Sequence, residues 1–311
     1  MNIKDTLKKE FLERKLTIEY NADVNLSTAF AKYPSFKESY NKIRTLQLDY
    51  AKLKYQNQDI SNVLNSIKME KRNLYKIAEE NNINIADLKP NYSCGKCKDL
   101  GFINNTPCEC FNSELSKKLL LHSGLNFRDL PDFESMKFDI IKDDNQKKNY
   151  VTCCNIFKEY VSKLGTTPKK LFLLSGQVGV GKTHILKATT HEAIKYGYFA
   201  LYTTSFDLNK AFLGYHCAKL QEKEEILEKY LTCDLLLIDD LGTENKLKNV
   251  TVEYLYLIIN QRLESGKNTI ITTNLNIDEL KDQYDERIMS RISNKQNCIQ
   301  AVMQGNDLRI G

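Results

Sequence analysis

A phosphate-binding pattern lies in the C-terminal half of the chain. Residues 176–183 read GQVGVGKT, which fits G-x-x-x-x-G-K-[ST] in full and directly follows the apolar run LFLLSG. Glycines let the backbone N–H groups curl around a phosphate, and the following helix points its positive end at the same anion. We expect Lys182 to reach the β- and γ-phosphates of ATP and Thr183 to ligate Mg²⁺. The predicted nucleotide contacts are Gly176, Gly179, Val180, Gly181, Lys182, Thr183, His184 and, through the magnesium ion, Asp239.

Acidic and amide side chains end two further apolar runs. CDLLLIDD ends in Asp239 and Asp240, and NTIITTN ends in Asn274. We expect Asp239 to hold Mg²⁺ through water, Asp240 to polarise the attacking water, and Asn274 to orient that water against the γ-phosphate. Asp240 is one methylene shorter than the Glu that many such sites carry there, which favours slow hydrolysis. The pattern therefore predicts an ATPase.

A second group of chemically active residues lies upstream. Cys94 and Cys97 form a C-x₂-C knuckle, and Cys108 and Cys110 follow it, separated from each other by one residue. Two close thiolate pairs on a short hairpin predict structural, tetrahedral Zn²⁺. His122 is an alternative ligand in place of one cysteine, and a redox pair at Cys94 and Cys97 is a rival interpretation that lacks the expected βαβ context. The other cysteines are predicted to pack as small apolar groups: Cys153, Cys154, Cys217, Cys233 and Cys298.

The elements around the phosphate loop follow an alternating pattern. From about residue 150, helical segments alternate with the apolar runs LFLLSG, YFALYTT, CDLLLIDD and NTIITTN. Runs of this length that end at polar or turn residues are typical of buried parallel strands. The C-terminal half is therefore predicted to be an α/β domain with a parallel sheet.

The N-terminal third is predicted to be helical. It has no glycine before Gly95, and residues 38–88 contain no helix breaker. Within that stretch five apolar residues recur at intervals of seven, which places them on one helical face: Leu46, Leu53, Ile60, Ile67 and Leu74. Two interpretations stay open, namely helices that pack on one another and a face reserved for another protein.

Composition sets the surroundings in which these groups would work. The chain has 311 residues, 45 Lys and Arg against 40 Asp and Glu, and no apolar run near the ~20 residues that span a bilayer. The N-terminus also lacks the apolar run of a signal peptide, so we expect a cytoplasmic protein with no membrane partner. Clustered cysteines in a reducing compartment favour metal binding over disulfides. The net charge of +5 permits a nucleic-acid partner without requiring one.

Together these motifs make the chain resemble the bacterial replicative-helicase loaders of the DnaC/DnaI type, which are AAA+ ATPases. The resemblance runs from about Cys94 to Arg309 through CGKCKDLGF, GQVGVGKTH, LLLIDDLG, ITTN, DERIMSRI and NDLR. It implies a sensor 1 role for Asn274, an arginine finger at Arg291 that reaches across a subunit interface, and a sensor 2 role for Arg309 in its own subunit. Residues 1–90 would then be a helical helicase-binding region, 91–130 a zinc-binding module and linker, and 131–311 the AAA+ ATPase domain.

The resemblance also implies partners. The N-terminal region would bind the hexameric replicative helicase, and the AAA+ domain would bind ATP and single-stranded DNA at replication initiation or restart. Self-assembly through the AAA+ domain and contacts with other primosome or initiator proteins would follow. Lysines near aromatic residues are candidate DNA contacts, since aromatic side chains stack bases. These candidates are Lys210, Lys219, Lys223, Lys246 and Lys248, with Phe212 and Tyr215 among the first group.

Several alternatives remain at this point. An ATPase helper of transposition shares the core motifs but typically lacks a long helical region and a cysteine cluster, and a phage-encoded loader fits equally well. A GTPase is disfavoured because residues 245–248, NKLK, lack the Asp of the guanine-binding motif. The Asp-Asp pair leaves open an adaptor that binds ATP without hydrolysing it.

Overall fold

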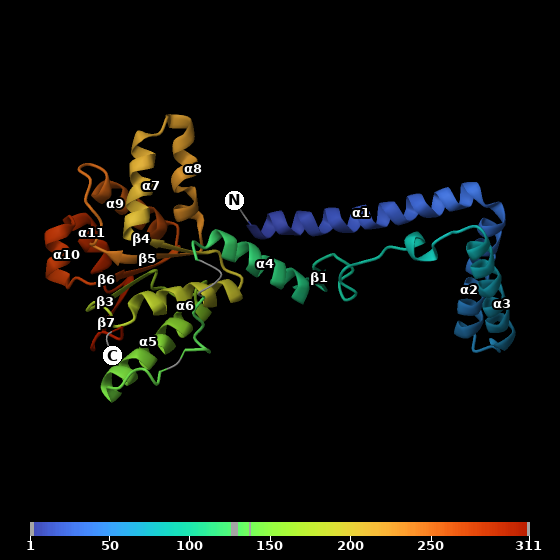
Figure 1. Ribbon diagram of the computed structural model, residues 1–311, viewed down its shortest axis with the longest axis horizontal. Helices are drawn as coiled ribbons and strands as arrows, with labels where there is room; N and C mark the ends of the chain where they lie inside the picture. Colours follow the sequence, from blue (N-terminus) through green and yellow to red (C-terminus); the bar gives the residue numbers. More distant parts are fainter. Residues whose placement is uncertain (1–2, 126–129, 137, 310–311) are drawn as a thin grey trace. The chain divides into compact units, whose positions relative to one another are not determined.

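The computed structural model describes residues 3–125, 130–136 and 138–309, so residues 126–129 of the expected linker lie outside the described residues. The chain divides into two compact units, one formed by Lys4–Phe111 and one that contains Asn112–Gly311 (Figure 1). None of the described helices is both long and apolar enough to cross a membrane.

Helices dominate the first unit. They are α1 (Ile3–Lys32), α2 (Pro34–Tyr55), α3 (Ser61–Glu80) and the short 3-10 helix η1 (Ile85–Leu88). Pro34 is the first residue of α2, where its missing N–H is not needed. Asn57, with a φ of 53°, lies in the turn that separates α2 from α3.

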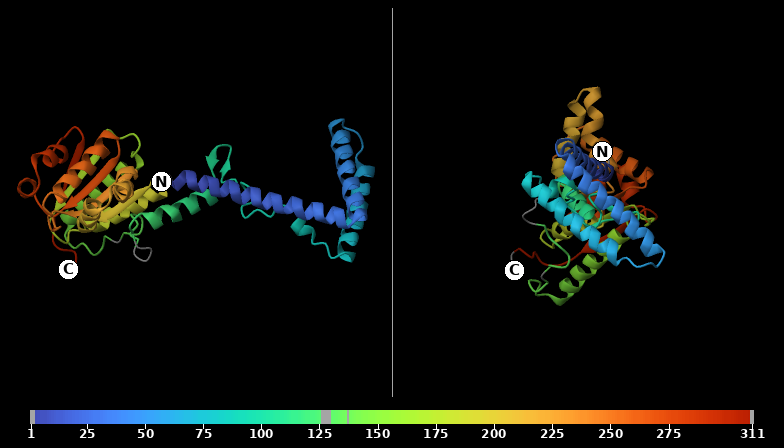
Figure 2. Two further views of the ribbon diagram at one scale, coloured as in Figure 1. Left: turned by 90° about the horizontal axis from the view of Figure 1, so that it is seen from above. Right: turned by 90° about the vertical axis from the view of Figure 1, so that its right-hand side faces the viewer.

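The heptad stripe therefore does not run along one helix. Leu46 and Leu53 lie on α2, whereas Ile67 and Leu74 lie on α3, and the two helices pack side by side (Figures 1 and 2). The core between them contains Phe36, Ile43, Leu74 and Ala78, joined by Ala29 at the end of α1. Of the two interpretations of the stripe, the structure therefore shows helices that pack on one another.

The cysteine segment folds as a hairpin followed by a helix. Strands β1 (Phe102–Ile103) and β2 (Thr106–Pro107) pair antiparallel, and α4 (Glu109–His122) follows. The ring of Phe111 at the start of α4 lies 5.3 Å from that of Phe11 on α1 and 4.7 Å from that of Phe102. Phe11 and Phe111 are fully buried, so an aromatic cluster joins this segment to α1.

The second unit is a parallel sheet with helices on both faces. Its sheet has the order β4-β5-β6-β3-β7, and every neighbouring pair is parallel. Helices α5 and α6 cover one face, and α7, α9 and α11 cover the other (Figures 1 and 2). The elements are α5 (Asp144–Ser162), β3 (Leu171–Gly176), α6 (Lys182–Lys195), β4 (Ala200–Thr204), α7 (Ser205–Cys217), α8 (Leu220–Thr232), β5 (Leu235–Leu241), α9 (Thr251–Glu264), β6 (Asn268–Thr273), α10 (Ile277–Gln283), α11 (Glu286–Ile292) and β7 (Cys298–Met303).

The predicted α/β class with a parallel sheet is confirmed. The four apolar runs form β3, β4, β5 and β6, and the central strands are almost entirely buried because helices cover both faces. Strand β7 was not among the predicted strands. This strand lies at the edge of the sheet, where only its two terminal residues are buried, so it lacks the continuous apolar run of the others.

Candidate functional site: a nucleotide cavity

The register of the sheet gathers the motif residues at one edge. Gly176 ends β3, the acidic pair lies near the end of β5, and Asn274 follows β6. Since Ser175 pairs with Thr273 and Leu241 pairs with the same Thr273, these three strand ends lie next to one another. In parallel sheets ligands bind in the crevice outside the carboxyl ends of the strands.

The loop between β3 and α6 adopts the conformation that its glycines allow. Gly179 has a φ of 83° and Gly181 a φ of 101°, in the left-handed region that side chains disfavour. A Cβ on Gly181 would also lie 2.4 Å from the ring of Tyr150 on α5. Any larger residue at Gly181 would therefore clash and strain the start of α6, whose N-terminus faces the site.

Lys182 forms the centre of a polar network. Its Nζ donates hydrogen bonds to the carbonyl oxygens of Gly176 (2.7 Å) and Gln177 (2.8 Å) and to Oδ1 of Asn274 (2.6 Å). Asn274 in turn donates to Asp240 at 3.4 Å. Burial lowers the pKa of Lys182, and the carboxylates of Asp240 and Asp239 oppose that shift. The lysine, the amide and one carboxylate are thus held together where a phosphate would bind.

The two acidic residues face different surroundings. A β-bulge interrupts the β5–β6 pairing between Ile238 and Leu241, and Asp240 has a φ of 55°. Such a bulge redirects side chains. Asp240 therefore lines the cavity, and burial followed by the charge of Asp239 raises its pKa.

Asp239 is buried beside the strands. Its carboxylate accepts hydrogen bonds from the hydroxyl of Tyr202 (2.8 Å) and from that of Thr272 (2.5 Å). Thr272 also accepts a hydrogen bond from the backbone N–H of Asp240 at 3.0 Å, so it ties both acidic residues to β6. Asp239 does not line the cavity, and its predicted link to Mg²⁺ through water stays a prediction.

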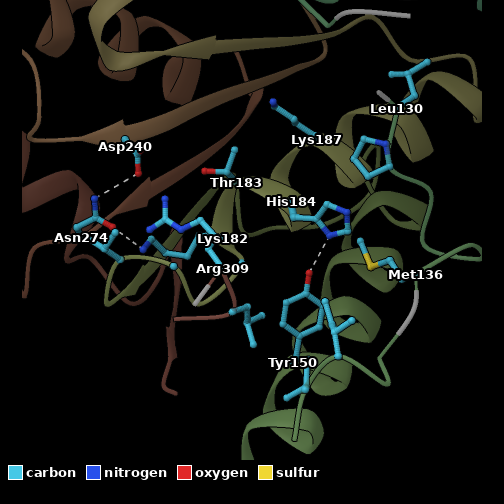
Figure 3. A pocket seen from close by; sticks show the side chains of 17 residues that line it. Leu130, Met136, Tyr150, Lys182, Thr183, His184, Lys187, Asp240, Asn274 and Arg309 are labelled. Atoms are coloured by element: carbon cyan, nitrogen blue, oxygen red, sulfur yellow. Dashed lines mark hydrogen bonds between the residues drawn. The ribbon is translucent and has the colours of Figure 1, made fainter. Parts of the chain in front are cut away.

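A cavity of about 730 Å³ opens beside this network (Figure 3). Its polar end carries Lys182, Thr183, Asp240, Asn274 and Arg309. Its other end is walled by apolar side chains of the segment before α5, among them Leu130, Met136 and Ile141. A cationic, glycine-rich end and an apolar end suit the phosphates and the base of a nucleotide.

Tyr150 and Lys187, which the motifs did not single out, complete the wall together with the predicted contact His184. The hydroxyl of Tyr150 lies 2.9 Å from Nδ1 of His184, and both side chains line the cavity (Figure 3). Burial, helped by the charge of Lys187, lowers the pKa of His184 and so favours its neutral ring. Lys187, one turn after Thr183 on α6, brings a further cation to the cavity. No motif marks Tyr150 or the apolar wall, because both precede the phosphate loop.

The arginines separate into two groups. Arg309 lines the cavity and pairs with Asp307 at 3.0 Å. The backbone N–H of Leu308 donates to the carbonyl oxygen of Gly179, which fastens this C-terminal segment to the phosphate loop. Arg291 does not line the cavity, and its guanidinium donates to Asn260 and Tyr256 on α9. An arginine finger that acts on a neighbouring subunit would need such a position away from its own nucleotide.

The profile of the IstB-like ATP binding protein family matches residues 132–295, which is more than half of the chain and includes the phosphate loop, the acidic pair and Asn274. The chain belongs to this family. Membership of an ATP-binding family implies a nucleotide with Mg²⁺, and the residues at the polar end of the cavity fit both.

Similar proteins include replication factors. The chain is 31% identical over 123 residues to the replicative helicase loader DnaC of Escherichia coli K12, covering 39% of this chain and 49% of DnaC. It is 29% identical over 160 residues to the chromosomal replication initiator protein DnaA of Campylobacter jejuni strain 81-176, covering 51% of this chain and 35% of DnaA. A crystal structure of the DnaC helicase loader superimposes with a TM-score of 0.44 at 23% identity, over 55% of this chain and 98% of that one. The chain thus spans about half the length, or less, of these two curated relatives.

The cysteine cluster of this family member forms a second candidate site. The sulfur atoms of Cys94, Cys97, Cys108 and Cys110 lie within 4.8 Å of one another. Cys94 and Cys108 are 3.9 Å apart, and Cys97 and Cys110 are 3.4 Å apart. Zn–S bonds of about 2.3 Å in a tetrahedron place the sulfurs roughly 3.8 Å apart. The four thiols therefore fit a zinc ion with every coordination position closed.

Backbone N–H groups point at the sulfur atoms of Cys94 and Cys97. The N–H of Gly101 points at Sγ of Cys97 at 3.3 Å, and backbone hydrogen bonds lower the pKa of Cys94 to about 7. Asp99 is buried and accepts from the N–H groups of Ser93 (2.7 Å) and Cys94 (2.8 Å). Asp99 is a structural residue of the site that cysteine spacing alone does not identify.

The structure excludes one open alternative, His122 as a zinc ligand, and contradicts one prediction, the burial of Cys217. His122 is exposed at the last position of α4, twelve residues after Cys110, and twelve residues of helix span about 18 Å. His122 is therefore not a ligand in place of a cysteine. Among the other cysteines, Cys153, Cys154, Cys233 and Cys298 are buried as predicted, but Cys217 is exposed at the end of α7.

The candidate DNA contacts differ in their burial and in the partners of their side chains. Phe212 is a core residue with 2% exposure, so it does not stack bases. Lys223 lies over the ring of Tyr215, and Lys246 donates to the carbonyl oxygen of Gln283. Phe206 at the start of α7, an aromatic residue that was not among the predicted contacts, is 63% exposed.

Proposed function

We propose that the chain is an ATP-dependent loader that binds the hexameric replicative DNA helicase and delivers it onto single-stranded DNA at replication initiation or restart. The observation that carries the proposal is the cavity in which Lys182, Asn274 and Asp240 form one network, in a chain with a separate helical unit. Membership of an ATP-binding family and the similarity to DnaC support it.

The proposed ATPase reaction assigns a role to each polar residue. Lys182 and Thr183 would bind the phosphates and Mg²⁺, which shields the charge that develops on the γ-phosphate. Asp240 would polarise the attacking water, and Asn274, already bonded to Asp240, would orient it. Arg309 would contact the nucleotide of its own subunit and Arg291 that of a neighbour, so turnover would depend on self-assembly. Hydrolysis would act as a timing step, and it would be slow because Asp240 is short.

Each region of the chain would have a separate role in loading. Residues 1–90 would bind the helicase, 91–130 would form the zinc-stabilised module and linker, and 131–311 would bind ATP and DNA. On α7, Phe206 and Lys210 are both exposed and lie one helical turn apart. An exposed aromatic ring beside a lysine supports a contact with single-stranded DNA there.

A mixing experiment tests the proposal. The full chain and its cognate replicative helicase are combined with ATP and a single-stranded oligonucleotide, and complex mass and helicase transfer to the oligonucleotide are measured. We expect a complex with the wild type, and Arg291→Ala should bind ATP normally but lose turnover and timely release. Absence of any complex with the helicase would overturn the loader function. Binding to a transposase in place of the helicase would favour the alternative role in transposition.

A further inference from the structure

The segment that carries Arg309 belongs to no helix or strand. It follows β7 and runs from Gln304 to Arg309, and we call it the 304–309 segment. Its last residue lines the polar end of the cavity together with Lys182 (Figure 3). Because the segment lies outside the hydrogen-bonded ladder of the sheet, the place of the Arg309 guanidinium depends on a few separate contacts.

One of these contacts is a double hydrogen bond from α5. The side-chain amide of Gln146 donates to the carbonyl oxygen of Asn306 at 2.8 Å, and its oxygen accepts from the N–H of Asn306 at 3.1 Å. Gln146 is only 6% exposed, whereas Asn306 lies at the surface. Gly305 approaches the same side chain so closely that a Cβ there would lie 2.2 Å from Cδ of Gln146. A buried side chain thus pairs with both backbone groups of one residue, as a neighbouring strand would.

The side chain of Gln146 does not cap its own helix. Asp143 is the N-cap of α5, and its carboxylate accepts a hydrogen bond from the N–H of Gln146 at 2.7 Å. In a capping box a Gln at this position would turn back to the N–H of the N-cap residue. The side chain of Gln146 reaches instead to Asn306, 160 residues further along the chain. Burial of an amide is unfavourable unless it is hydrogen-bonded, so the contact with Asn306 accounts for this polar residue in the core.

The other end of the 304–309 segment is fastened to the phosphate loop. The N–H of Leu308 donates to the carbonyl oxygen of Gly179 at 3.0 Å. The carboxylate of Asp307 lies against the same glycine, where a Cβ would be 2.0 Å from Cγ of Asp307. The two oxygens of Asp307 accept from the guanidinium of Arg309 at 3.1 and 3.0 Å, and such a two-point pair fixes the plane of the guanidinium. Arg309 is therefore oriented at the end of a segment that both α5 and the phosphate loop hold.

We propose that Gln146 is a positioning residue for nucleotide binding, an inference that rests on the proposed function of the chain as an ATPase. Gln146 does not line the cavity, and it acts through Asn306 and the 304–309 segment, which place the Arg309 guanidinium at the phosphates. Without the double hydrogen bond the phosphate loop alone would hold the segment, and Arg309 would be ordered only when ATP binds. Ordering on binding lowers affinity, because a preorganised contact does not lose this conformational freedom.

A double-mutant cycle in the full chain tests the inference. Gln146→Met keeps the length of the side chain and removes both hydrogen bonds, and the control Asn145→Met removes an amide at the adjacent, exposed position of α5. Affinity for ATP with Mg²⁺ is measured by titration calorimetry, and circular dichroism and the Tm without ATP check the fold. Arg309→Ala should lose about tenfold in ATP affinity, as expected for one charge-assisted hydrogen bond.

The expected result of the cycle is a loss that is not additive. Gln146→Met should lose about fivefold in ATP affinity and Asn145→Met less than about twofold. The double variant Gln146→Met/Arg309→Ala should bind within about twofold of Arg309→Ala, because Gln146 acts through Arg309. A merely structural loss would add to that of Arg309→Ala. Gly305→Ala, whose Cβ would push Gln146 away, should lose affinity to a similar extent and replaces Gln146→Met in the cycle if that variant does not fold.

Three outcomes would overturn the inference. If the wild type binds ATP and both Gln146→Met and Gly305→Ala bind within about twofold of it, the inference is wrong and the ATPase function stands. If the losses of Gln146→Met and Arg309→Ala multiply in the double variant, Gln146 does not act through Arg309, and the inference is wrong as well. If the wild type binds no ATP, the proposed function and the inference fail together.

Discussion

Replacement of Lys182 by alanine separates ATP binding from folding. Lys182 Nζ is held by two carbonyl oxygens and by Asn274, at the position that the phosphates would take. A unit charge about 4 Å from a phosphate oxygen contributes roughly 4 kcal/mol at an effective dielectric constant near 20. Exchange of the existing hydrogen bonds offsets about 1 kcal/mol of this gain. Lys182→Ala should therefore lose about 3 kcal/mol of ATP binding, which is on the order of a 100-fold rise in Kd.

The stability of the ATP-free protein should change little. Burial of the charged lysine costs free energy, as its lowered pKa indicates, and this cost offsets the contribution of its hydrogen bonds to stability. Its carbonyl partners belong to half-buried Gly176 and exposed Gln177, so removal of the amine does not leave them unpaired in a dry core. The expected change in unfolding free energy is below about 1 kcal/mol.

Thermal unfolding with and without ATP measures both effects. ATP at 100 times the wild-type Kd stabilises the folded state by about 2.7 kcal/mol. For a domain of about 200 residues this corresponds to a rise in Tm of roughly 5–11 °C. Lys182→Ala should show almost no rise at the same ATP concentration, whereas Lys148→Ala, an exposed change on α5, should respond like the wild type. An ATP-dependent rise of wild-type size in Lys182→Ala would refute the placement of the phosphates.

Three further predictions concern the metal, the core and pH. The purified chain should contain one zinc per molecule by elemental analysis. Cys97→Ser should lose the zinc and unfold the N-terminal unit, because structural zinc contributes about 10–16 kcal/mol in small zinc-finger peptides. A metal-free chain with an unchanged unfolding profile would contradict this prediction. Tyr284→Phe removes the hydroxyl that donates a hydrogen bond to the buried carboxylate of Glu244, and it should lower the unfolding free energy measured in urea by about 1.5–3 kcal/mol. The control Tyr196→Phe changes an exposed residue and should lower it by less than about 0.5 kcal/mol. Equal losses would show that the buried hydrogen bond adds no stability. The folded-state pKa of His184 is lowered, so below about pH 6.5 the unfolded chain binds more protons than the folded chain. The unfolding free energy should therefore decrease as the pH is lowered through that range, and it should decrease less in His184→Gln. Identical slopes for the two proteins would exclude His184 as the cause.

Local patterns were sufficient for much of the fold and for half of the site. The continuous apolar runs predicted β3 to β6, because strands buried on both faces must be apolar along their whole length. The phosphate loop was predicted from eight contiguous residues, since a nest of backbone N–H groups depends only on local glycines. The four cysteines were grouped correctly as well, because a short hairpin brings its two ends together without help from distant segments.

Other features depended on contacts between distant segments. The heptad stripe of residues 46–74 predicted one helical face, but a turn at Asn57 folds it into two helices, and only their mutual packing buries Ile43 and Leu74. Similarly, the apolar wall of the cavity comes from residues that carry no motif and precede α5, which packs beside α6: Leu130, Pro131, Met136, Ile140 and Ile141.

The sequence by itself determined that this protein has a phosphate loop, an acidic pair and a thiol cluster, because each is encoded within a few neighbouring residues. Only the tertiary structure decided which carboxylate of the pair lines the cavity. A bulge set by the β5–β6 register turns Asp240 toward Lys182 and leaves Asp239 bonded to Tyr202 and Thr272. The physical reason is that strand register is a property of paired strands, so no single segment of the chain can specify it.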